Sequence, residues 1–324
     1  MTTAQSSVID IHCHLFDQVS KVGVDLEAMP VALRAEIMLD AGSAGPRSFD
    51  SFVNWARKAR SEGWAEVYGL VNVAEMGLDK APEIVTEADF QPERAAEMAL
   101  TYPDIARGLK MRAVQPAIGV LGLKLVEKTV EAAGQAELPI MVHFGQQDGS
   151  YAEDEMLTAE ILDRLRPGDI ASHVFTGQSG GAFANRKNFE AAKRARGRGV
   201  LFDIGHGRFN FDIAAARMGR ERDFAPDFIS SDVTSGTASW LSLPYAMSAV
   251  AAAGFDTDTV VRAVTANPAK WLRIDRPAGK AIASTPVRSS QTDSSGNTYP
   301  VERSFAIVAA RPTQDQSEEK HHEA

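Results

Sequence analysis

The stretch SVIDIHCH, residues 7–14, sets a pattern that recurs along the chain: a short run rich in Val, Ile and Leu that ends in polar side chains. Most runs of this kind are followed by a longer Ala-rich segment with helical spacing, which is typical of parallel strands joined by crossover helices. The expected strands are SVIDIHCH, AEIMLDAGSAG, AEVYGLVNVA, RGLKMRAV, PIMVHFG, DIASHVFTG, GVLFDIGHG and DFISSDVTSG. Eight such units are what a closed (β/α)8 TIM barrel requires. We therefore expect that α/β fold over residues 1–274.

The intervening segments predict an outer ring of helices. These are expected at residues 49–61, 92–102, 120–133, 154–165, 188–198 and 240–253, followed by a last helical segment interrupted at Pro268.

The composition changes after residue 274 to Pro, Ser, Thr and Gly. Residues 275–312 are expected to form a small β-rich appendage, and residues 313–324 a polar, disordered tail. Two adjacent histidines in that tail, His321 and His322, are expected to be solvated rather than to bind metal.

Charge and cysteine content exclude several classes of partner. The net charge is −9 and the isoelectric point is near 5.4, which argues against binding to nucleic acid or an anionic membrane. The single cysteine, Cys13, cannot form an intrachain disulfide, and the sequence shows neither a signal peptide nor an apolar run long enough to span a bilayer. We expect a cytoplasmic protein.

Histidines gather at the ends of the expected strands, where the active site of a TIM barrel lies. The first strand ends in His12 and His14, whose alternate positions place both imidazoles on one face. The fifth and sixth strands end at His143 and His173, and the eighth at Asp232. Any one of them could be a structural residue. Together, imidazoles and a carboxylate are the ligands of zinc and similar divalent ions.

Lys110 lies within the apolar fourth strand, where an unpaired ammonium would be costly. It must therefore be paired, deprotonated or modified. Beside two metal ions, a neutral amine that captured carbon dioxide would become a carbamate able to bridge them. The alternatives are that Lys110 reaches solvent or pairs with an acid such as Asp203. Arg112, two residues later on the same face, either binds a substrate carboxylate or forms a structural salt bridge.

The positions of Asp232 and His206 in the sequence indicate their expected roles. Asp232 could both ligate metal and accept the proton of an attacking water, although an Asp after a strand can also simply cap a turn. His206 is flanked by glycines, which let a substrate approach the backbone, and it is expected to contact substrate rather than metal.

These strand-end motifs resemble those of the amidohydrolase superfamily. VIDIHCHL, GLKMRAV, PIMVHFG, DIASHVFTG, VLFDIGHG, FISSDVTSG and VTANPAKWL match it in order, from about residue 8 to residue 274. More narrowly, LDAGSAG, HVFTG and DIGHG resemble the deacetylase branch often labelled dihydroorotase-like, whose members hydrolyse acylated hydroxy or amino carboxylates.

The resemblance implies two divalent metal ions, with zinc expected. It places His12, His14 and Asp232 on the more buried ion, His143 and His173 on the second, and N6-carboxylated Lys110 between them, with Arg112 and His206 on the substrate side. Members also carry a small β-sandwich built from segments before and after the barrel. Here the leading segment is expected to be absent and the trailing one shortened, which would leave apolar surface that a homo-oligomer could cover.

The expected function is hydrolysis of an amide or ester bond in a small acylated amino or hydroxy carboxylate, by a metal-bound hydroxide. A cyclic amide hydrolase or a deaminase on the same scaffold remains an alternative. A degenerate barrel that binds metal or ligand without turnover is the alternative from another class.

Overall fold

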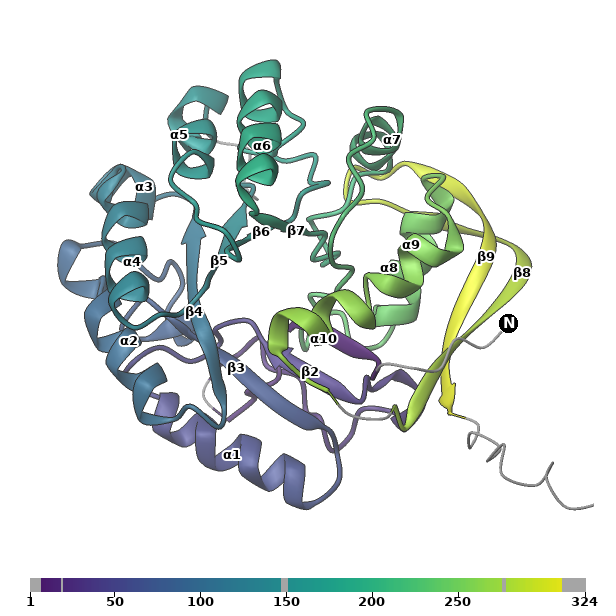
Figure 1. The fold of residues 1–324 in the computed structure, drawn as a ribbon, viewed down its shortest axis with the longest axis horizontal. Coiled ribbons are helices and arrows are strands. Elements are labelled where there is room, and N and C mark those ends of the chain that lie inside the picture. Colours follow the sequence, from purple (N-terminus) through teal and green to yellow (C-terminus); the bar gives the residue numbers. More distant parts are fainter. Residues whose placement is uncertain (1–6, 19, 147–150, 276–277, 311–324) are drawn as a thin grey trace, which may run out of the picture.

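A seven-stranded parallel sheet forms the centre of the protein. The computed structural model describes residues 7–18, 20–146, 151–275 and 278–310. Each strand pairs with the next along the chain, and the sheet curls into a barrel-like wall (Figure 1). The strands are β1 Ile9–Cys13, β2 Ile37–Asp40, β3 Glu66–Asn72, β4 Ala106–Ala113, β5 Ile140–Phe144, β6 Ile170–Ser172 and β7 Leu201–Asp203. The predicted succession of parallel strands is confirmed for these seven.

The segment expected as the eighth strand is not a regular strand. Phe228 forms a single parallel bridge with β7, and Val233 forms another with β1, so the segment lies between the two ends of the sheet. Asp232 has a φ of 50°, a left-handed conformation that interrupts an extended chain. The expectation of eight regular strands is corrected to seven for the part of the chain that the structure describes.

Helices surround the sheet on its outer side (Figure 1). They are α1 Phe49–Ser61, α2 Pro92–Thr101, α3 Ala117–Leu121, α4 Lys124–Gln135, α5 Thr158–Leu162, α6 Arg186–Arg198, α7 Ile213–Glu221, α8 Leu243–Ala252, α9 Thr257–Arg262 and α10 Ala266–Leu272. Side chains of Asn185, Asp212, Ser242 and Asp256 cap the amino termini of α6, α7, α8 and α9.

The helix predictions hold with four differences. The interruption expected at Pro268 lies instead at residues 263–265, between α9 and α10, and Pro268 is in the first turn of α10, where its missing N–H breaks no helical hydrogen bond. The helix expected at 120–133 is divided into α3 and α4 at Gly122, whose φ is 54°. The helix expected at 154–165 is reduced to α5, because Leu157 takes a left-handed conformation just before it. Helix α7 was not predicted at all, although Asp212 provides the capping signal that introduces it.

Two buried clusters fill the molecule. The larger lies mainly between the sheet and the surrounding helices, and the smaller includes Ile9 and Ile11 of β1 with Ala269 and Leu272 of α10. α10 therefore packs against the amino-terminal half of β1. This packing leaves the carboxyl ends of the strands for the polar residues described below.

A two-stranded antiparallel hairpin follows the barrel, formed by β8 Lys280–Thr292 and β9 Thr298–Ala309. β9 packs on α8 (Figure 1). Buried Tyr299, Val301 and Phe305 supply the apolar face of β9. This hairpin confirms a β-rich segment after residue 274.

The turn of the hairpin contacts the chain beyond β7. The main-chain N–H and the hydroxyl of Ser294 both donate to the carbonyl of Phe211, at 2.9 and 2.8 Å. Asp293 accepts a hydrogen bond from the N–H of Ile213 at 3.2 Å. The hairpin is thus attached to the segment that leads from β7 into α7.

The expected tail at 313–324, with His321 and His322, lies outside the described residues. Among the helices that are described, none is both long and apolar enough to cross a membrane.

Candidate metal centre

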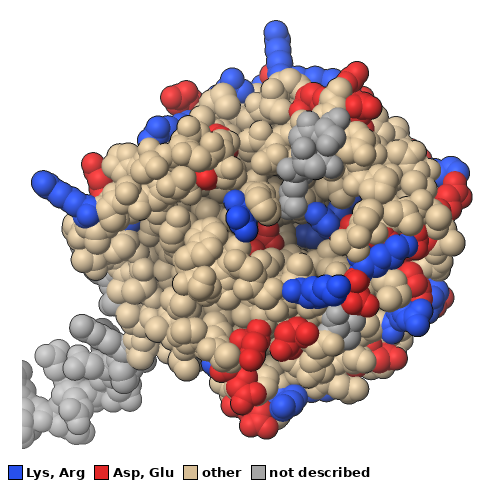
Figure 2. Space-filling model, turned by 180° about the vertical axis from the view of Figure 1, so that it is seen from behind, with Lys and Arg blue, Asp and Glu red and all other residues tan. Residues whose placement is uncertain are grey.

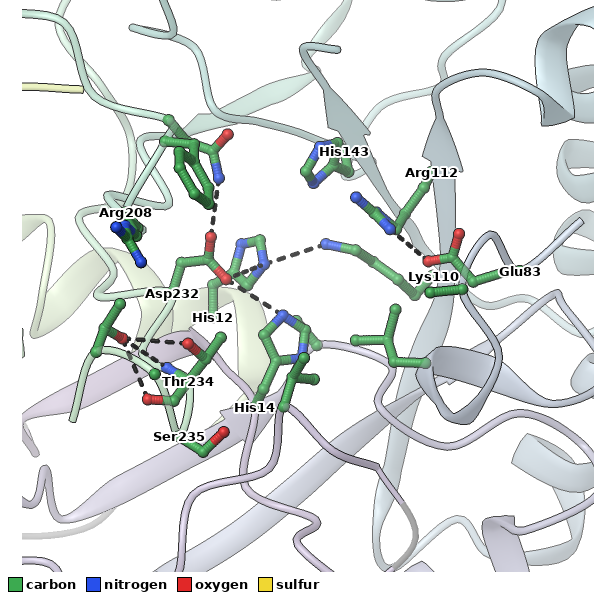
Figure 3. A pocket seen from close by; sticks show the side chains of 18 residues that line it. His12, His14, Glu83, Lys110, Arg112, His143, Arg208, Asp232, Thr234 and Ser235 are labelled. Carbon is green, nitrogen blue, oxygen red and sulfur yellow. Dashed lines mark hydrogen bonds and ion pairs between the residues drawn. The ribbon is translucent and has the colours of Figure 1, made fainter. Parts of the chain in front are cut away.

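The structure brings together all six residues predicted as metal ligands (Figure 3 labels five of them). His12 lies in β1 and His14 follows it, Lys110 lies in β4, His143 in β5, His173 directly after β6 and Asp232 in the segment between β7 and β1. All six are buried. The carboxyl ends of parallel strands therefore meet as the sequence predicts.

His12, His14 and Asp232 form the tightest group. Oδ1 of Asp232 lies 3.5 Å from Nε2 of His12 and 3.2 Å from Nε2 of His14. Their ligand atoms all lie within 4.8 Å of one another, so one ion could contact all three.

In each of these two imidazoles, the other ring nitrogen, Nδ1, lies within hydrogen-bond distance of a polar side chain. Nδ1 of His12 lies 3.0 Å from Oδ2 of Asp203 and 2.8 Å from the hydroxyl of Ser172. Nδ1 of His14 lies 3.0 Å from the hydroxyl of Ser43. A second partner of this kind is what orients a histidine that binds metal.

His143 and His173 form a second pair, with Nδ1 of His143 only 2.8 Å from Nε2 of His173. The outer nitrogen of each ring faces a main-chain carbonyl, that of Gly145 at 3.2 Å for His143 and that of Gly205 at 2.8 Å for His173. A nitrogen that bonds to a carbonyl must carry the proton. In neutral rings, the two inner nitrogens then face each other as lone pairs.

Lone pairs at that separation require a cation between or beside them, either a proton or a metal ion. Burial, followed by neighbouring positive groups, holds the pKa of His143 well below its ordinary value. Burial likewise lowers the pKa of His173 to about 3 and lowers that of His12. Because these rings resist protonation, the arrangement fits a divalent metal better than a proton.

Asp232 is ionised in this setting. Burial alone would raise the pKa of its carboxyl, but His12, His14 and His173 outweigh burial and hold that pKa below its ordinary value. Asn210 donates from Nδ2 to Oδ2 of Asp232 at 3.0 Å. The centre thus offers an ionised carboxylate, and the rings of His12, His143 and His173 resist protonation, as divalent-ion binding requires.

Lys110 lies at the edge of this group, with Nζ 3.3 Å from Nε2 of His12. Burial lowers the pKa of Lys110 to about 8, and no ion pair to it occurs within the described ranges. The alternative in which Lys110 reaches solvent is wrong, because its side chain is buried. The alternative of a salt bridge with Asp203 is not seen either, since that carboxylate bonds to His12.

The LDAGSAG motif makes room for Lys110. A Cβ at Gly42, whose φ is 83°, would lie 2.6 Å from Cβ of Lys110. Asp40 of the same motif accepts from the N–H of Leu15 at 2.8 Å and from that of Ser43 at 2.7 Å. The motif therefore shapes the wall around Lys110 and ties β2 to the chain that follows His14.

A cavity of about 460 Å³ opens beside the metal centre, which is a volume suited to a small molecule. Its polar lining comprises His12, His14, Glu83, Lys110, Arg112, His143, Arg208, Asn210, Asp232, Thr234, Ser235 and Thr237. The face of the molecule in Figure 2 has a hollow near its centre, where basic and acidic side chains lie close together.

Arg112 lies in the cavity wall, but its charge is already paired. Nη1 of Arg112 is 2.5 Å from Oε1 of Glu83, a buried carboxylate. Figure 3 shows the two side chains directed toward each other at one side of the cavity. This is the structural salt bridge that the sequence leaves open as the alternative to substrate binding.

His206 lies behind the cavity wall and is absent from the residues that line it. Its ring stacks on Phe211 with centroids 4.8 Å apart, and its Nδ1 lies 2.9 Å from the carbonyl of Gly207. Nε2 is buried and has no hydrogen-bond partner among the residues that the structure describes. The structure therefore places His206 as a support for its loop, and the predicted contact with substrate stays a prediction.

Sequence reasoning did not select Glu83, Arg208 or Asn210, although all three line the cavity. Arg208 and Asn210 follow the DIGHG motif directly, so proximity to that motif was an available signal. Glu83 lies in an irregular segment between β3 and α2, and no motif marks it.

Comparisons with known proteins agree with this geometry. No protein-family model matches the sequence. A deacetylase of Agrobacterium fabrum is 29% identical over 274 residues, which are 82% of this chain and 65% of that protein. The chain thus spans less than two thirds of the length of this relative.

Two solved structures have similar folds. A dihydroorotase superposes with a TM-score of 0.83 at 26% identity, over 94% of this chain and 83% of that one. An adenine deaminase superposes with the same TM-score at 22% identity, over 94% of this chain and 84% of that one, which shows a shared fold. These similarities confirm the resemblance to the amidohydrolase superfamily that the strand-end motifs indicate.

Proposed function

We propose that the protein is a metal-dependent hydrolase that removes an acyl group from a small acylated amino or hydroxy carboxylate. One observation carries the proposal: four buried imidazoles, each held from behind through one nitrogen, direct the other nitrogen toward the same space as Asp232 and Lys110. Similarity to a deacetylase of Agrobacterium fabrum supports the choice of reaction.

In this proposal the centre holds two divalent ions such as zinc. His12, His14 and Asp232 would hold one, and His143 with His173 would hold the other. When bound, the ions would supply a water made acidic enough to attack and a polarised acyl carbonyl. The protein's own residues supply the position of the substrate and the transfer of the proton.

Asp232 is proposed to move that proton. Its carboxylate is ionised, and Asn210 fixes Oδ2 while Oδ1 faces the two imidazoles of His12 and His14. Asp232 would accept a proton from the attacking water and deliver it to the leaving amine or alkoxide. The acyl–nitrogen or acyl–oxygen bond breaks, and water provides the oxygen of the released acid.

Lys110 is proposed to be carboxylated on its side-chain nitrogen. Its burial, its lowered pKa and its lack of an ion pair in the described ranges all favour a neutral amine. A neutral amine adds carbon dioxide and releases one proton, which yields an anionic carbamate. That group would place oxygen ligands between the two groups of histidines.

We further propose that the segment between β7 and β1 completes a (β/α)8 barrel, since it bridges to both strands. The hairpin β8–β9 would be the trailing part of a small β-sandwich. We retain the cytoplasm as the proposed location because the one cysteine is free and buried.

A panel of open-chain acyl compounds, cyclic amides and adenine tests which reaction the protein catalyses. The zinc-loaded protein would be assayed with N-acyl amino acids, O-acyl hydroxy acids, dihydroorotate, hydantoins and adenine. We expect turnover of the open-chain acyl compounds. Turnover confined to the cyclic amides would instead support the dihydroorotase-like alternative, which the 26% identity to a solved dihydroorotase favours. Turnover confined to adenine would support a deaminase.

Metal content tests the centre independently of any substrate. We expect about two divalent ions per chain after growth with zinc. Fewer than about one ion per chain would exclude the two-metal centre. Full metal content without turnover of any compound in the panel would support a degenerate barrel.

A further inference from the structure

The loop at residues 205–210 is attached to the metal centre at both ends. The carbonyl of Gly205 accepts a hydrogen bond from Nδ1 of His173 at 2.8 Å. Asn210 donates to Asp232 at 3.0 Å. Residues 206–209, which lie between Gly205 and Asn210, are therefore held beside His173 and Asp232.

The middle of the loop packs directly on Asp232. Gly207 has a φ of 50°, and a Cβ there would lie 2.4 Å from Oδ2 of Asp232. The N–H of Gly207 also donates to the carbonyl of Ser231 at 2.9 Å. Because the backbone at Gly207 touches Asp232, the next residue, Arg208, begins at the edge of the cavity.

Arg208 lines the cavity, on the opposite side of Asp232 from Lys110 and Arg112 in Figure 3. Its guanidinium lies over the ring of Phe209, at 5.3 Å from the centroid. Within the described residues it makes no ion pair or hydrogen bond. An arginine fixed at its backbone and free at its charged end can bind an incoming anion.

The other ionisable groups of the cavity lining are paired within the protein, except Lys110, whose amine is proposed to be neutral and then carboxylated. Arg112 is paired with Glu83 at 2.5 Å, and Lys110 is buried against His12. The two acids of the wall are likewise engaged, Glu83 by Arg112 and Asp232 by the centre. Among the described residues of the lining, Arg208 is thus the cation that remains for a substrate.

Uncharged hydroxyl groups line this side of the cavity, although that of Ser235 donates to the carbonyl of Lys21 at 2.9 Å and that of Thr234 lies 3.3 Å from the hydroxyl of Thr237. Thr234 and Ser235 belong to the segment that follows Asp232, and their side chains line the same space as Arg208. Figure 3 shows this hydroxyl-bearing segment below Arg208. A carboxylate that contacts Arg208 would therefore meet hydroxyl groups and no unpaired acid of the described lining.

We propose that Arg208, and not Arg112, binds the carboxylate of the substrate. The planar guanidinium would form two parallel hydrogen bonds with the two carboxylate oxygens. Arg208 then selects for acylated acids over their neutral amides and esters. The position of the scissile bond beside Asp232 rests on the proposed function, whereas the binding of a carboxylate does not.

Calorimetry on the zinc-loaded protein tests the proposal without turnover. The probes are the N-methanesulfonyl derivatives of alanine, leucine and phenylalanine, each as the acid and as the carboxamide. Their sulfonamide replaces the scissile amide and is not hydrolysed. We expect the best acid to bind roughly 10- to 100-fold more tightly than its carboxamide, the difference that a charge-assisted pair provides.

The decisive variant is Arg208→Gln, with Arg222→Gln as its matched control. Arg222 is also exposed and lies over a phenylalanine ring, that of Phe189, at 4.7 Å, but it does not line the cavity. Arg208→Gln should abolish the preference for the acid and leave the affinity for the carboxamide within about twofold. Arg222→Gln should retain the full preference.

Three results would overturn the assignment of Arg208. These are equal affinity for acid and carboxamide in the unsubstituted protein, absence of binding by every acid in the set, and a preference that survives Arg208→Gln. Failure of the proposed function is separate: a protein that binds the acids through Arg208 but cleaves no acyl compound would refute the hydrolysis and keep the binding site.

Discussion

Oδ2 of Asp203 lies 3.0 Å from Nδ1 of His12, and the carboxylate of Asp203 also accepts hydrogen bonds from Ser172 and Ser230, each at 2.5 Å. Burial opposes its ionisation, but these bonds and His12 keep the pKa of Asp203 below its ordinary value. The carboxylate therefore fixes the proton of His12 on Nδ1 and leaves Nε2 free for metal.

We expect Asp203→Asn to weaken zinc binding by about 10- to 100-fold, because the amide orients His12 less strongly and lowers its basicity. Competition with a chelator would measure the affinity. Asp163→Asn, which removes an exposed carboxylate paired with Arg194 at the surface, serves as the control and should leave affinity unchanged. Unchanged affinity in Asp203→Asn would show that Asp203 does not position the ligand.

Asp232→Asn should reduce kcat by a factor on the order of 10² to 10⁴, since the amide cannot accept the proton of the attacking water. Steady-state kinetics with the best acyl substrate would show the loss, and circular dichroism should show an intact fold. Full activity in this variant would mean that another group carries the proton.

Lys110→Ala should lose both metal and activity, while Lys128→Ala, at an exposed lysine paired with Glu131, should lose neither. In the unsubstituted protein, labelled bicarbonate should give a carbamate signal by carbon-13 NMR, and Lys110→Ala should remove that signal. A metal-loaded, active protein without the carbamate signal would contradict the proposed modification.

Gly207→Ala and Gly122→Ala separate a steric clash from backbone strain. Both glycines have positive φ, 50° and 54°, which strains a residue with a Cβ, so both substitutions should cost at least about 1 kcal/mol of stability. A Cβ at Gly122 has nothing within 4 Å, whereas one at Gly207 meets Asp232 at 2.4 Å. We expect a loss of turnover only in Gly207→Ala, measured beside urea unfolding. Equal activity in the two variants would argue against close contact between the loop and Asp232.

The lowered pKa of His206 predicts that the free energy of unfolding depends on pH. Burial lowers its pKa from 6.5 to about 4, so the unfolded chain binds the proton more readily than the folded protein between these values. The stabilising contribution of the neutral ring is present above about pH 6.5 and is lost as the pH falls toward 4. In the unsubstituted protein, the free energy of unfolding falls as the pH is lowered across this range. Replacing His206 with Phe should make that fall smaller by about 3 kcal/mol, which is the free energy that corresponds to the pKa shift. Urea unfolding of the metal-free protein at both ends of the range would measure it, and an identical acid dependence in His206→Phe would contradict the assignment.

The convergence of the residues predicted to bind metal could be foreseen from the sequence, because parallel strands bring their carboxyl ends together and each strand-end histidine adds to one site. The same principle does not predict details that depend on contacts between residues far apart in the sequence. Arg112 is paired with Glu83, which lies 29 positions earlier in an irregular segment without a recognisable motif. The conformation of Asp232, with positive φ, also depends on its place between β7 and β1.

The first strand, β1, shows a second limit of prediction from the sequence. Strict alternation places Cys13 on the same side as Ile9 and Ile11, yet these two isoleucines belong to one buried cluster and Cys13 to the other. An irregularity in the pairing of β1 with β2 lies between Asp10 and Cys13 and accounts for the change. The sequence predicts that His12 and His14 share a side, but the irregularity between Asp10 and Cys13 leaves no signal in composition or spacing.

The contact between the hairpin turn and Phe211 connects the outer surface to the loop that carries Arg208. Phe211 stacks on His206, which in turn belongs to the loop that carries Arg208, so a displacement at Ser294 can pass inward through two contacts and the backbone of that loop. A turn at the surface accepts substitutions and insertions that the cavity wall, packed against the metal centre, does not. If Arg208 selects the substrate as proposed, substitutions in the hairpin turn can change that selection while every residue of the candidate metal centre stays the same.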